Sequence, residues 1–199
     1  SSAAFWVIAA VCHPNASLTI QGVGVNPTRT GILEVVKHMG ANIKLENQRS
    51  EGGEPVADIL VESSELVGKE ISGDMIPLLI DEIPVIALAA CFARGDTIIR
   101  NAESLRVKET DRIQTTVSEL TALGADIEEL PDGMAIHGKG RLHGSYTRSH
   151  GDHRLAMTLG IAGLLAEGST DILDAQVSSI SYPNFWNDML RLAPEMVVH

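Results

Sequence analysis

The chain has 199 residues, of which 44% are hydrophobic, which is enough for one large globular domain or two small ones. Its formal net charge of −11 and its pI of about 5.0 argue against nucleic acid as a partner, because phosphate-backbone binding depends on clustered Lys and Arg side chains. Its apolar runs are shorter than the ~18 residues that a membrane span needs, so the sequence gives no reason to expect a membrane partner.

Hydrophobic periodicity, together with proline and glycine positions, predicts alternating helices and strands. In chain order we expect helix 2–12, strand 17–22, helix 28–39, strand 41–46, strand 57–62, helix 81–94, strand 96–101, helix 107–123, strand 125–130, strand 133–137, helix 152–167, strand 169–174, helix 183–192 and a last strand near 195–198. Pro27 and Pro183 stand where a first helical turn tolerates proline, and Gly40 and Gly124 stand where helices stop. The opening segment is apolar, but no Lys or Arg precedes Arg29, so it is interpreted as a buried helix and not as a secretion signal.

A short motif recurs along the chain and predicts an internal repeat. Met39-Gly-Ala-Asn-Ile and Leu123-Gly-Ala-Asp-Ile each end a predicted helix and start a strand. Ala-Ala pairs followed by a short strand also recur, and Ala166-Glu-Gly-Ser-Thr resembles a third copy. We therefore expect a single domain over residues 1–199 built from three units of a βαβαββ type. The expected repeats lie near residues 1–75, 76–150 and 151–199.

The polarity of the predicted elements indicates which of them are buried. The first helix of each unit is apolar nearly all round, at residues 3–11, 83–92 and 155–165, whereas strands such as 126–130 carry charged residues. Helices that are apolar on every side belong in a core, and strands that carry charge have a solvated face. The expected fold class is a mixed α/β (α+β) domain that is inside-out, with helices packed inside and small sheets outside.

Parallel packing of these three helices would bring their N-terminal ends to one place. Ser1, Asp81 and the cluster Asp152–Arg154 all fall at these beginnings. Helix N-termini carry a partial positive charge and exposed amide groups, which attract anions. That end of the domain is therefore the predicted ligand face.

The heptad Arg106-Val-Lys-Glu-Thr-Asp-Arg112 carries the clearest chemistry. On the predicted helix 107–123, Lys108 and Arg112 share one face. Arg112 can hold a phosphate or carboxylate with two parallel hydrogen bonds, Lys108 supplies a mobile ammonium group, and Glu109 is a carboxylate that could carry a proton. A solvated helix surface with internal ion pairs explains the composition of the heptad equally well.

Acidic residues at the other helix starts allow two interpretations. Asp81 and Asp152 could each cap a helix, because a carboxylate accepts hydrogen bonds from first-turn amides. Asp81 could instead orient or deprotonate a substrate hydroxyl. His153 is more often structural when it stands alone, but Arg154 opposes the helix dipole, as do the two cations of the heptad. Cations placed in this way argue for a bound anion.

The sequence offers no motif for a metal or a nucleotide cofactor. No helical pair spaced for zinc is formed by His137, His143, His150 and His153. The glycines of Gly22-Val-Gly-Val and Gly138-Lys-Gly lack the remaining spacing of a phosphate-binding loop. We therefore expect no metal site and no cofactor.

Two cysteines, Cys12 and Cys91, have no Cys neighbour and no metal-ligand spacing. They are predicted to be buried, reduced thiols, which is typical of a cytoplasmic protein. The chain also starts without Met and within a predicted helix, so we expect it to be part of a longer protein.

Three motifs, in this order and at predicted helix starts, resemble the second globular domain of the EPSP synthase (5-enolpyruvylshikimate-3-phosphate synthase) family. They are Asp81-Glu-Ile-Pro, Leu105-Arg-Val-Lys-Glu-Thr-Asp-Arg and Asp152-His-Arg-Leu-Ala-Met. The resemblance includes the opening Ser-Ser-Ala-Ala-Phe and Val25-Asn-Pro-Thr-Arg-Thr-Gly, so it covers essentially the whole chain. Asp-Glu-Ile-Pro and Asn-Pro-Thr-Arg look like the bacterial branch that includes glyphosate-tolerant enzymes. Some relatives in that branch carry the synthase behind a fused prephenate or cyclohexadienyl dehydrogenase.

The resemblance implies a reaction and its partners. The family transfers the enolpyruvyl group of phosphoenolpyruvate to the 5-hydroxyl of shikimate 3-phosphate, through a tetrahedral intermediate that expels phosphate, without a metal or an organic cofactor. Its fold has two similar domains, each with helices inside and sheets outside. The implied partners are the two substrates, the missing first domain and, in some relatives, the upstream dehydrogenase.

The motifs also imply roles for individual residues. Asp81 would contact the shikimate hydroxyls and act as the base, Lys108 would bridge the substrate and the transferred proton, and Glu109 would help shuttle the proton at the methylene carbon. Arg112 and Arg154 would hold the phosphoenolpyruvate carboxylate or phosphate. The expected supporting residues are Asp152, His153 and Ser104.

Two features depart from the family pattern. Many relatives have a Lys shortly before a Phe-Pro near the C-terminus, where this chain has Ser178-Ser-Ile-Ser-Tyr-Pro183. The family's active site lies between two domains, so the chain is expected to fold but to hold half a site and not to turn over. Two alternatives remain: a UDP-N-acetylglucosamine enolpyruvyl transferase, which shares the fold but lacks this form of the heptad, and a non-catalytic binding module on the same repeat.

Overall fold

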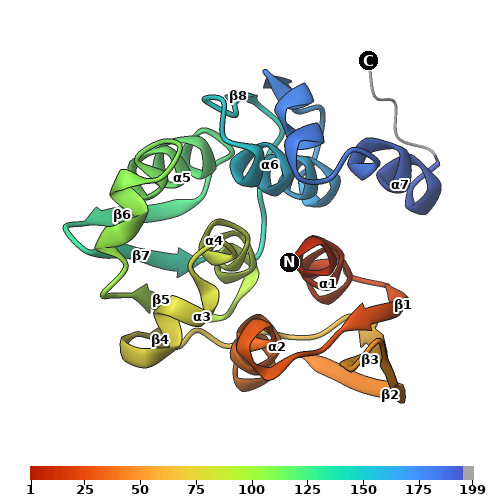
Figure 1. Ribbon diagram of the computed structural model, residues 1–199. Coiled ribbons are helices and arrows are strands. Elements are labelled where there is room, and N and C mark those ends of the chain that lie inside the picture. Colours follow the sequence, from red (N-terminus) through yellow and green to blue (C-terminus); the bar gives the residue numbers. More distant parts are fainter. Residues whose placement is uncertain (195–199) are drawn as a thin grey trace.

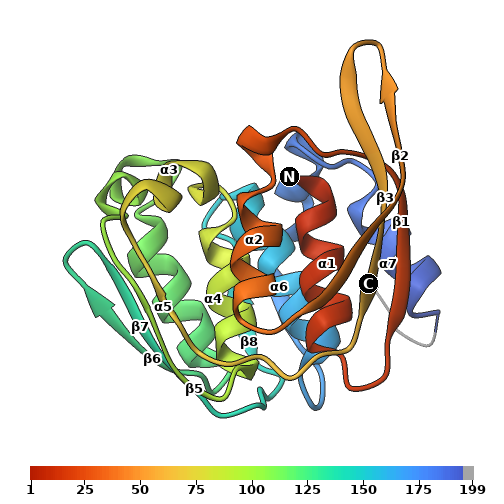
Figure 2. The same cartoon turned by 90° about the horizontal axis from the view of Figure 1, so that it is seen from below.

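Helices and short strands alternate through the computed structural model, which describes residues 1–194 (Figures 1 and 2). The α-helices are α1 (Ser2–Cys12), α2 (Gly31–His38), α3 (Ile76–Leu79), α4 (Ile83–Phe92), α5 (Arg112–Ala122), α6 (His153–Leu165) and α7 (Phe185–Leu192). The strands are β1 (Ser17–Gly24), β2 (Asn42–Glu51), β3 (Glu54–Glu62), β4 (Glu70–Ile71), β5 (Gly95–Ile99), β6 (Asp126–Leu130), β7 (Gly133–Gly138), β8 (Tyr146–Arg148) and β9 (Asp171–Leu173). The 3₁₀ turns are Pro27–Arg29, Gly73–Met75, Glu103–Val107 and Ala175–Ile180. The strand predicted near 195–198 lies outside the described residues.

Three apolar helices, α1, α4 and α6, form the interior and contact one another pairwise. Side chains from all sides of each helix are buried, and Ile8, Ile86 and Leu159 are fully inaccessible. Figure 1 looks along these helices and shows them in the middle of the molecule, with the sheets around them. An all-round apolar helix cannot leave one face in water without losing hydrophobic stabilisation, so it occupies the centre.

The sheets lie outside this helical interior. Within residues 1–194 the strand orders are β1-β3-β2, β4-β5-β7-β6 and β8-β9. In β6, Ile127 points into the core while Glu128 and Glu129 are exposed, as expected for a strand with one solvated face. The predicted mixed α/β class with helices inside and sheets outside is therefore confirmed for the described residues.

Short strands were missed by the sequence prediction. β4 pairs in parallel with β5, and β8 pairs in parallel with β9. Each is too short to give a recognisable alternation of polar and apolar residues. Both strands precede the expected unit boundaries at 75/76 and 150/151 but pair with strands that follow them.

Several predicted helices begin later than expected. α5 begins at Arg112 and not at residue 107, because a separate 3₁₀ turn, Glu103–Val107, is followed by an extended residue, Lys108. Asp111 then caps α5 by accepting a hydrogen bond from the amide of Gln114 (3.0 Å). The prediction that Lys108 and Arg112 share a helix face is therefore wrong, and any proximity of their side chains must come from tertiary structure.

An aromatic cluster joins α7 to α1 and α6. The rings of Trp6 and Phe185 stack with centroids 5.2 Å apart, and the indole of Trp6 donates to the Tyr182 hydroxyl (3.0 Å). Phe185 and Trp186 lie so close to Gly160 of α6 that a Cβ there would be 2.8 Å from one ring and 3.0 Å from the other. Glycine at this position therefore lets the C-terminal helix dock.

We expect Gly160→Ala to lower the free energy of unfolding by about 1–2 kcal/mol, because the ring overlap outweighs the better helix propensity of Ala. Thermal denaturation would then show a lower Tm by about 2–4 °C for each kcal/mol. Gly163→Ala, in the same helix, would place its Cβ no closer than 3.2 Å to another atom, Thr170 Cβ, so it is the matched control and is expected to cost less. Equal Tm values for the two variants would contradict the packing argument.

The cysteines are free thiols, with Cys91 buried and Cys12 partly buried. Burial raises the pKa of Cys91 to about 12 and also raises that of Cys12. Among residues 1–194, no single helix has the length and hydrophobicity to cross a membrane. Only the bent pair Gly73–Leu79 and Ile83–Phe92, with 110° between its parts, meets those two requirements.

Candidate functional site

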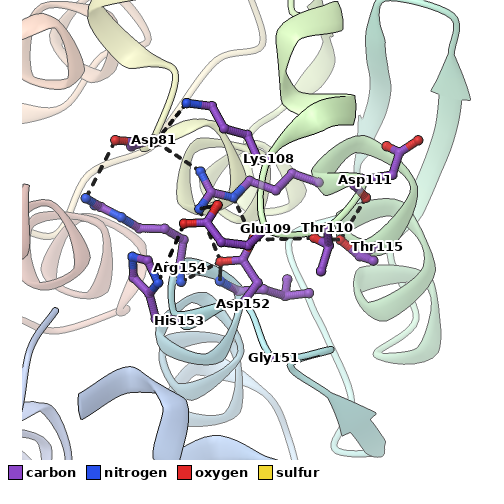
Figure 3. A network of polar contacts seen from close by, with 12 residues as sticks. Asp81, Lys108, Glu109, Thr110, Asp111, Thr115, Gly151, Asp152, His153 and Arg154 are labelled. Atoms are coloured by element: carbon purple, nitrogen blue, oxygen red, sulfur yellow. Dashed lines mark hydrogen bonds and ion pairs between the residues drawn. The ribbon is translucent and has the colours of Figure 1, made fainter. Parts of the chain in front are cut away.

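The beginnings of α4, α5 and α6 meet in one cluster of charged side chains (Figure 3). Asp81 lies in the turn before α4, and Arg112 is the first residue of α5. The segment before α5 contributes Lys108 and Glu109, and the start of α6 contributes the range 152–154. Of the predicted convergence of the starts of α1, α4 and α6, the meeting of α4 and α6 is thus observed in this cluster, and the start of α5 joins them.

Arg112 is the centre of the cluster and is only 1% exposed. Its Nε donates to Asp152 Oδ2 (2.6 Å) and its Nη1 to Asp81 Oδ1 (3.0 Å). Its Nη2 donates to Glu109 Oε2 (2.7 Å) and to Asp152 Oδ1 (3.3 Å). Burial alone would lower the pKa of Arg112, but hydrogen bonding and charge from Asp152, Glu109 and Asp81 outweigh it and raise the pKa. The guanidinium therefore stays charged and ties three carboxylates together.

Asp152 is completely buried, and its carboxylate bonds both to α6 and to α5. As one sequence interpretation predicted, it caps α6, because Oδ1 accepts from the amides of Arg154 (2.8 Å) and Leu155 (3.4 Å). Oδ2 of the same carboxylate accepts a hydrogen bond from Nε of Arg112 and a longer one, 3.4 Å, from the hydroxyl of Thr110. One side chain therefore fixes the start of α6 and the orientation of Arg112 together.

Asp81 does not cap a helix, so that interpretation of it is wrong. α4 begins two residues later, after Glu82, and the carboxylate of Asp81 faces cations instead. Besides Arg112 it has Lys108 Nζ and Arg154 Nη2 as neighbours, each 3.8 Å away. Partial burial works to raise the pKa of Asp81, but Arg154, Arg112 and Lys108 together outweigh it and lower the pKa. Asp81 is therefore ionised at neutral pH.

Arg154 is a cation with unmet hydrogen-bonding capacity. Its Nη1 lies 3.7 Å from Glu82 and its Nη2 lies 3.8 Å from Asp81, both too far for hydrogen bonds. Its Nε is buried and has no hydrogen-bond partner among the described residues. Buried donors are normally hydrogen-bonded, so a guanidinium that has only long ion pairs and one unbonded Nε among the described residues is suited to an incoming anion.

Lys108, Glu109 and His153 line the more accessible side of the cluster. The side chains of Lys108 and Glu109 are 34% and 44% exposed. The His153 side chain is only 14% exposed, and its Nδ1 lies 3.9 Å from Glu109 Oε1 (Figure 3). Lys108 and Glu109 are therefore accessible to a ligand from solvent, while Arg112 and Asp152 are buried on the core side of the cluster.

Other predicted residues lie apart from this cluster. Ser104 is exposed in the turn Glu103–Val107, and within residues 1–194 no hydrogen bond joins it to the charged side chains. The segment around Ser178 and Tyr182, which was expected to depart from the family pattern, packs against α1 through the aromatic cluster. Among the described residues, no group of three or more His, Cys, Asp or Glu side chains could hold a metal ion.

Sequence reasoning missed Thr110, Asp111 and Glu119. A signal for Asp111 was present, since an Asp followed three residues later by Gln114 resembles a capping box and marks the true start of α5. Glu119 gave no such signal, because its partners Arg148 and His150 come from a distant segment.

The chain matches known proteins along most of its length. Residues 1–189 match the family described as EPSP synthase (3-phosphoshikimate 1-carboxyvinyltransferase). A 3-phosphoshikimate 1-carboxyvinyltransferase of Herpetosiphon aurantiacus is 57% identical over 192 residues, which cover 96% of this chain and 44% of the relative. One from Roseiflexus sp. (strain RS-1) is 58% identical over 193 residues, covering 97% of this chain and 45% of the relative. The chain therefore spans about half the length of these curated relatives.

A solved structure gives the same picture. EPSP synthase from Acinetobacter baumannii superposes with a TM-score of 0.91 at 40% sequence identity. The superposition covers 96% of this chain and 45% of that one. The mixed α/β arrangement described above is thus shared with a solved structure of an EPSP synthase.

Proposed function

The chain belongs to the EPSP synthase family, and we propose from this premise that it forms one wall of an active site for enolpyruvyl transfer. The full-length protein would act as a 3-phosphoshikimate 1-carboxyvinyltransferase. It would transfer the enolpyruvyl group of phosphoenolpyruvate to the 5-hydroxyl of shikimate 3-phosphate and release phosphate. This chain would supply acid, base and anion-binding groups, and a first domain would supply the opposite wall.

The observation that carries the proposal is the guanidinium of Arg154 beside Asp81, because its buried Nε has no hydrogen-bond partner among residues 1–194 and its ion pairs are long. Phosphoenolpyruvate has a carboxylate and a phosphate, and both are good acceptors for a guanidinium or an ammonium group. The N-terminal ends of α4 and α6 add a partial positive charge at the same place. An anion bound here would give the buried Nε of Arg154 the partner that it lacks.

Asp81 is proposed to receive the substrate hydroxyl. In the present arrangement its pKa is lowered by Arg154, Arg112 and Lys108 against the effect of burial, so it is a weak base. When a substrate anion neutralises Arg154 and Lys108, this lowering is reduced and the pKa of Asp81 rises. Binding of the anion would therefore prepare Asp81 to accept the proton of the 5-hydroxyl.

The chemical steps need one proton added and one removed at the methylene carbon. Protonation of that carbon, assigned to Lys108 and Glu109, makes C2 electron-poor, and carboxylates nearby stabilise this charge. The 5-oxygen then bonds to C2 as its proton passes to Asp81. In the second step, the methyl group formed by protonation loses a proton, and the bond between C2 and the phosphate oxygen breaks. These two changes give the enolpyruvyl product and free phosphate. Arg154 neutralises the departing phosphate or holds the carboxylate.

Arg112 is proposed to act mainly by holding the carboxylates of the cluster in place, and less by donating hydrogen bonds to the substrate. Each of its nitrogens already donates to Asp81, Glu109 or Asp152. A substrate carboxylate could bind Arg112 directly by replacing Glu109 as the acceptor of Nη2. That exchange would release Glu109 for proton transfer.

The three-unit repeat is also part of the proposal. Equivalent backbone hydrogen bonds at the ends of two units support it. In one unit Val67 N donates to Met39 O (2.8 Å) and Gly68 N to Arg94 O (2.9 Å), and in the other His143 N donates to Leu123 O (2.9 Å) and Gly144 N to Glu167 O (2.7 Å). Met39 and Leu123 are the residues that open the motif repeated in the sequence. Membership of the bacterial branch that includes glyphosate-tolerant enzymes stays a prediction. Inhibition of the full-length enzyme by glyphosate would test whether it shares that tolerance.

Phosphate release from phosphoenolpyruvate and shikimate 3-phosphate tests the function. We expect the full-length protein to release phosphate and the isolated chain to remain folded, by circular dichroism, without turnover, because half of the anion-binding groups are on the other domain. Adding a separately produced first domain is expected to restore measurable turnover. Turnover by the isolated chain would contradict the half-site proposal. Turnover only with UDP-N-acetylglucosamine in place of shikimate 3-phosphate would favour the other enolpyruvyl transferase.

A further inference from the structure

The turn between β8 and α6 controls where the key residues of α6 lie. It runs over residues 149–152 and ends at Asp152, which holds both Arg112 and the start of α6. Its backbone is unusual, because His150 and Gly151 have φ of 54° and 79°. Glycine adopts such values freely, but a residue with a side chain does so only where its surroundings impose them.

Glu119 of α5 supplies that constraint. It lies seven residues after Arg112, so both side chains leave α5 on the same face, and both bond to the segment that runs from β8 to α6. The residue is only 7% exposed. Its Oε2 accepts the amide of Arg148 (2.8 Å), and its Oε1 lies 2.7 Å from His150 Nε2. One buried carboxylate therefore holds the turn by backbone and by side chain.

Further hydrogen bonds carry this constraint to Asp152. Ser149, fully buried, donates its amide to Leu173 O (3.1 Å) and its hydroxyl to Asp174 O (3.0 Å). The amide of Asp152 in turn donates to Ser149 O (2.9 Å). The carboxylate of Asp152 is thus fixed between the clamp formed by Glu119 and His150 on one side and Arg112 on the other.

We propose that Glu119 and His150 are positioning residues for the enolpyruvyl transfer, acting through the 149–152 turn on Asp152, Arg112 and Arg154. They touch none of the groups assigned to bind substrate. The inference rests on the proposed function, because its effect is on the anion held by Arg154. Loosening the clamp would move the start of α6, while Asp81 on the turn before α4 would stay in place. Phosphoenolpyruvate binding is therefore affected more than shikimate 3-phosphate binding.

Steady-state kinetics of the full-length protein test this proposal. We expect Glu119→Ala to lower kcat/KM for phosphoenolpyruvate about 10- to 100-fold, since small displacements of anchoring groups have effects of this order. The KM for phosphoenolpyruvate should rise, and that for shikimate 3-phosphate should change little. Glu119→Gln, which retains one carbonyl oxygen, should recover part of the loss. Glu119→Ala with His150→Asn should resemble Glu119→Ala alone, because the two residues act as one unit.

The exposed pair His143 and Glu167, 3.8 Å apart, is the matched control. Glu167→Ala should leave both KM values unchanged. A Glu119→Ala enzyme with the wild-type KM for phosphoenolpyruvate, or with equal losses for both substrates, would overturn the proposal, because a general loss of folded protein affects both alike. Amide hydrogen exchange over residues 148–155 should be faster in Glu119→Ala than in Glu167→Ala. Hydrogen exchange needs no turnover, so it tests the clamp even if the wild-type enzyme lacks the proposed activity. Unchanged exchange in Glu119→Ala would also overturn the proposal.

Discussion

Replacing Asp152 by Ala is expected to lower the free energy of unfolding by about 3–5 kcal/mol, the range observed when one partner of a buried ion pair is removed. The side chain is fully buried and caps the N-terminus of α6 by accepting the amide of Arg154. It also neutralises Arg112, which is 1% exposed. Without Asp152, Arg112 keeps only Asp81 and Glu109, both of which are partly exposed. Urea unfolding of the 199-residue chain would measure the change.

An exposed aspartate provides the control for this variant. Asp126 pairs with Lys139 at 3.0 Å, but both side chains are largely exposed, so Asp126→Ala should cost less than about 1 kcal/mol. Arg112→Met combined with Asp152→Ala should be more stable than Asp152→Ala alone, because it leaves no unpaired buried charge. If Asp152→Ala and Asp126→Ala unfolded at the same urea concentration, the buried pair would not have the central role described for it.

Replacing Arg154 by Met is expected to separate activity from stability. In the full-length protein, kcat/KM for phosphoenolpyruvate should fall about 100-fold, which corresponds to the loss of one or two charge-assisted hydrogen bonds in the transition state. The free energy of unfolding should change little, because the loss of the long ion pairs with Asp81 and Glu82 is opposed by two gains. The substitution removes a buried Nε without a hydrogen-bond partner in residues 1–194, and it removes a cation that opposes the dipole of α6.

Arg100→Met is the matched control for Arg154. Arg100 forms an exposed ion pair with Asp132 at 3.2 Å, away from the cluster, so its loss should leave kcat/KM near the wild-type value. The non-catalytic binding module predicts the opposite result for Arg154, namely intact turnover in Arg154→Met. Clear destabilisation of Arg154→Met in thermal denaturation would show that Arg154 is a structural residue and not an anion-binding group.

The charged cluster has a two-level organisation that explains why these two arginines differ. Arg112 and Asp152 are buried and each forms several hydrogen bonds, so they hold the helix starts together. Arg154 and Lys108 have longer contacts, each 3.8 Å from Asp81, and the side chains of Arg154, Lys108 and Glu109 are all more accessible to solvent. A rigid lower level with a less satisfied upper level is what binding an anion requires, because the free donors are held in place before the ligand arrives.

Sequence patterns were sufficient for the class of fold, and they singled out several of the residues that meet in the charged cluster. The apolar helices at 3–11, 83–92 and 155–165 could be assigned to the interior because their hydrophobicity has no polar side, and burial follows directly from that. Asp81, Lys108, Arg112 and Arg154 were identified from motifs and from charges that oppose a helix dipole. These are local properties that each segment carries by itself.

The tertiary structure alone decided how these residues are used. It placed the start of α5 at Arg112, put Asp81 beside cations and not at a helix cap, and buried Arg112 beneath the site. It also joined Glu119 to His150, which are 31 residues apart in the chain. The free energy of a charged side chain depends on which groups surround it in space, and residues distant in sequence supply those groups. For this reason the sequence identified the charges, whereas only the packing of α4, α5 and α6 determined which of them are paired and which remain available for a ligand.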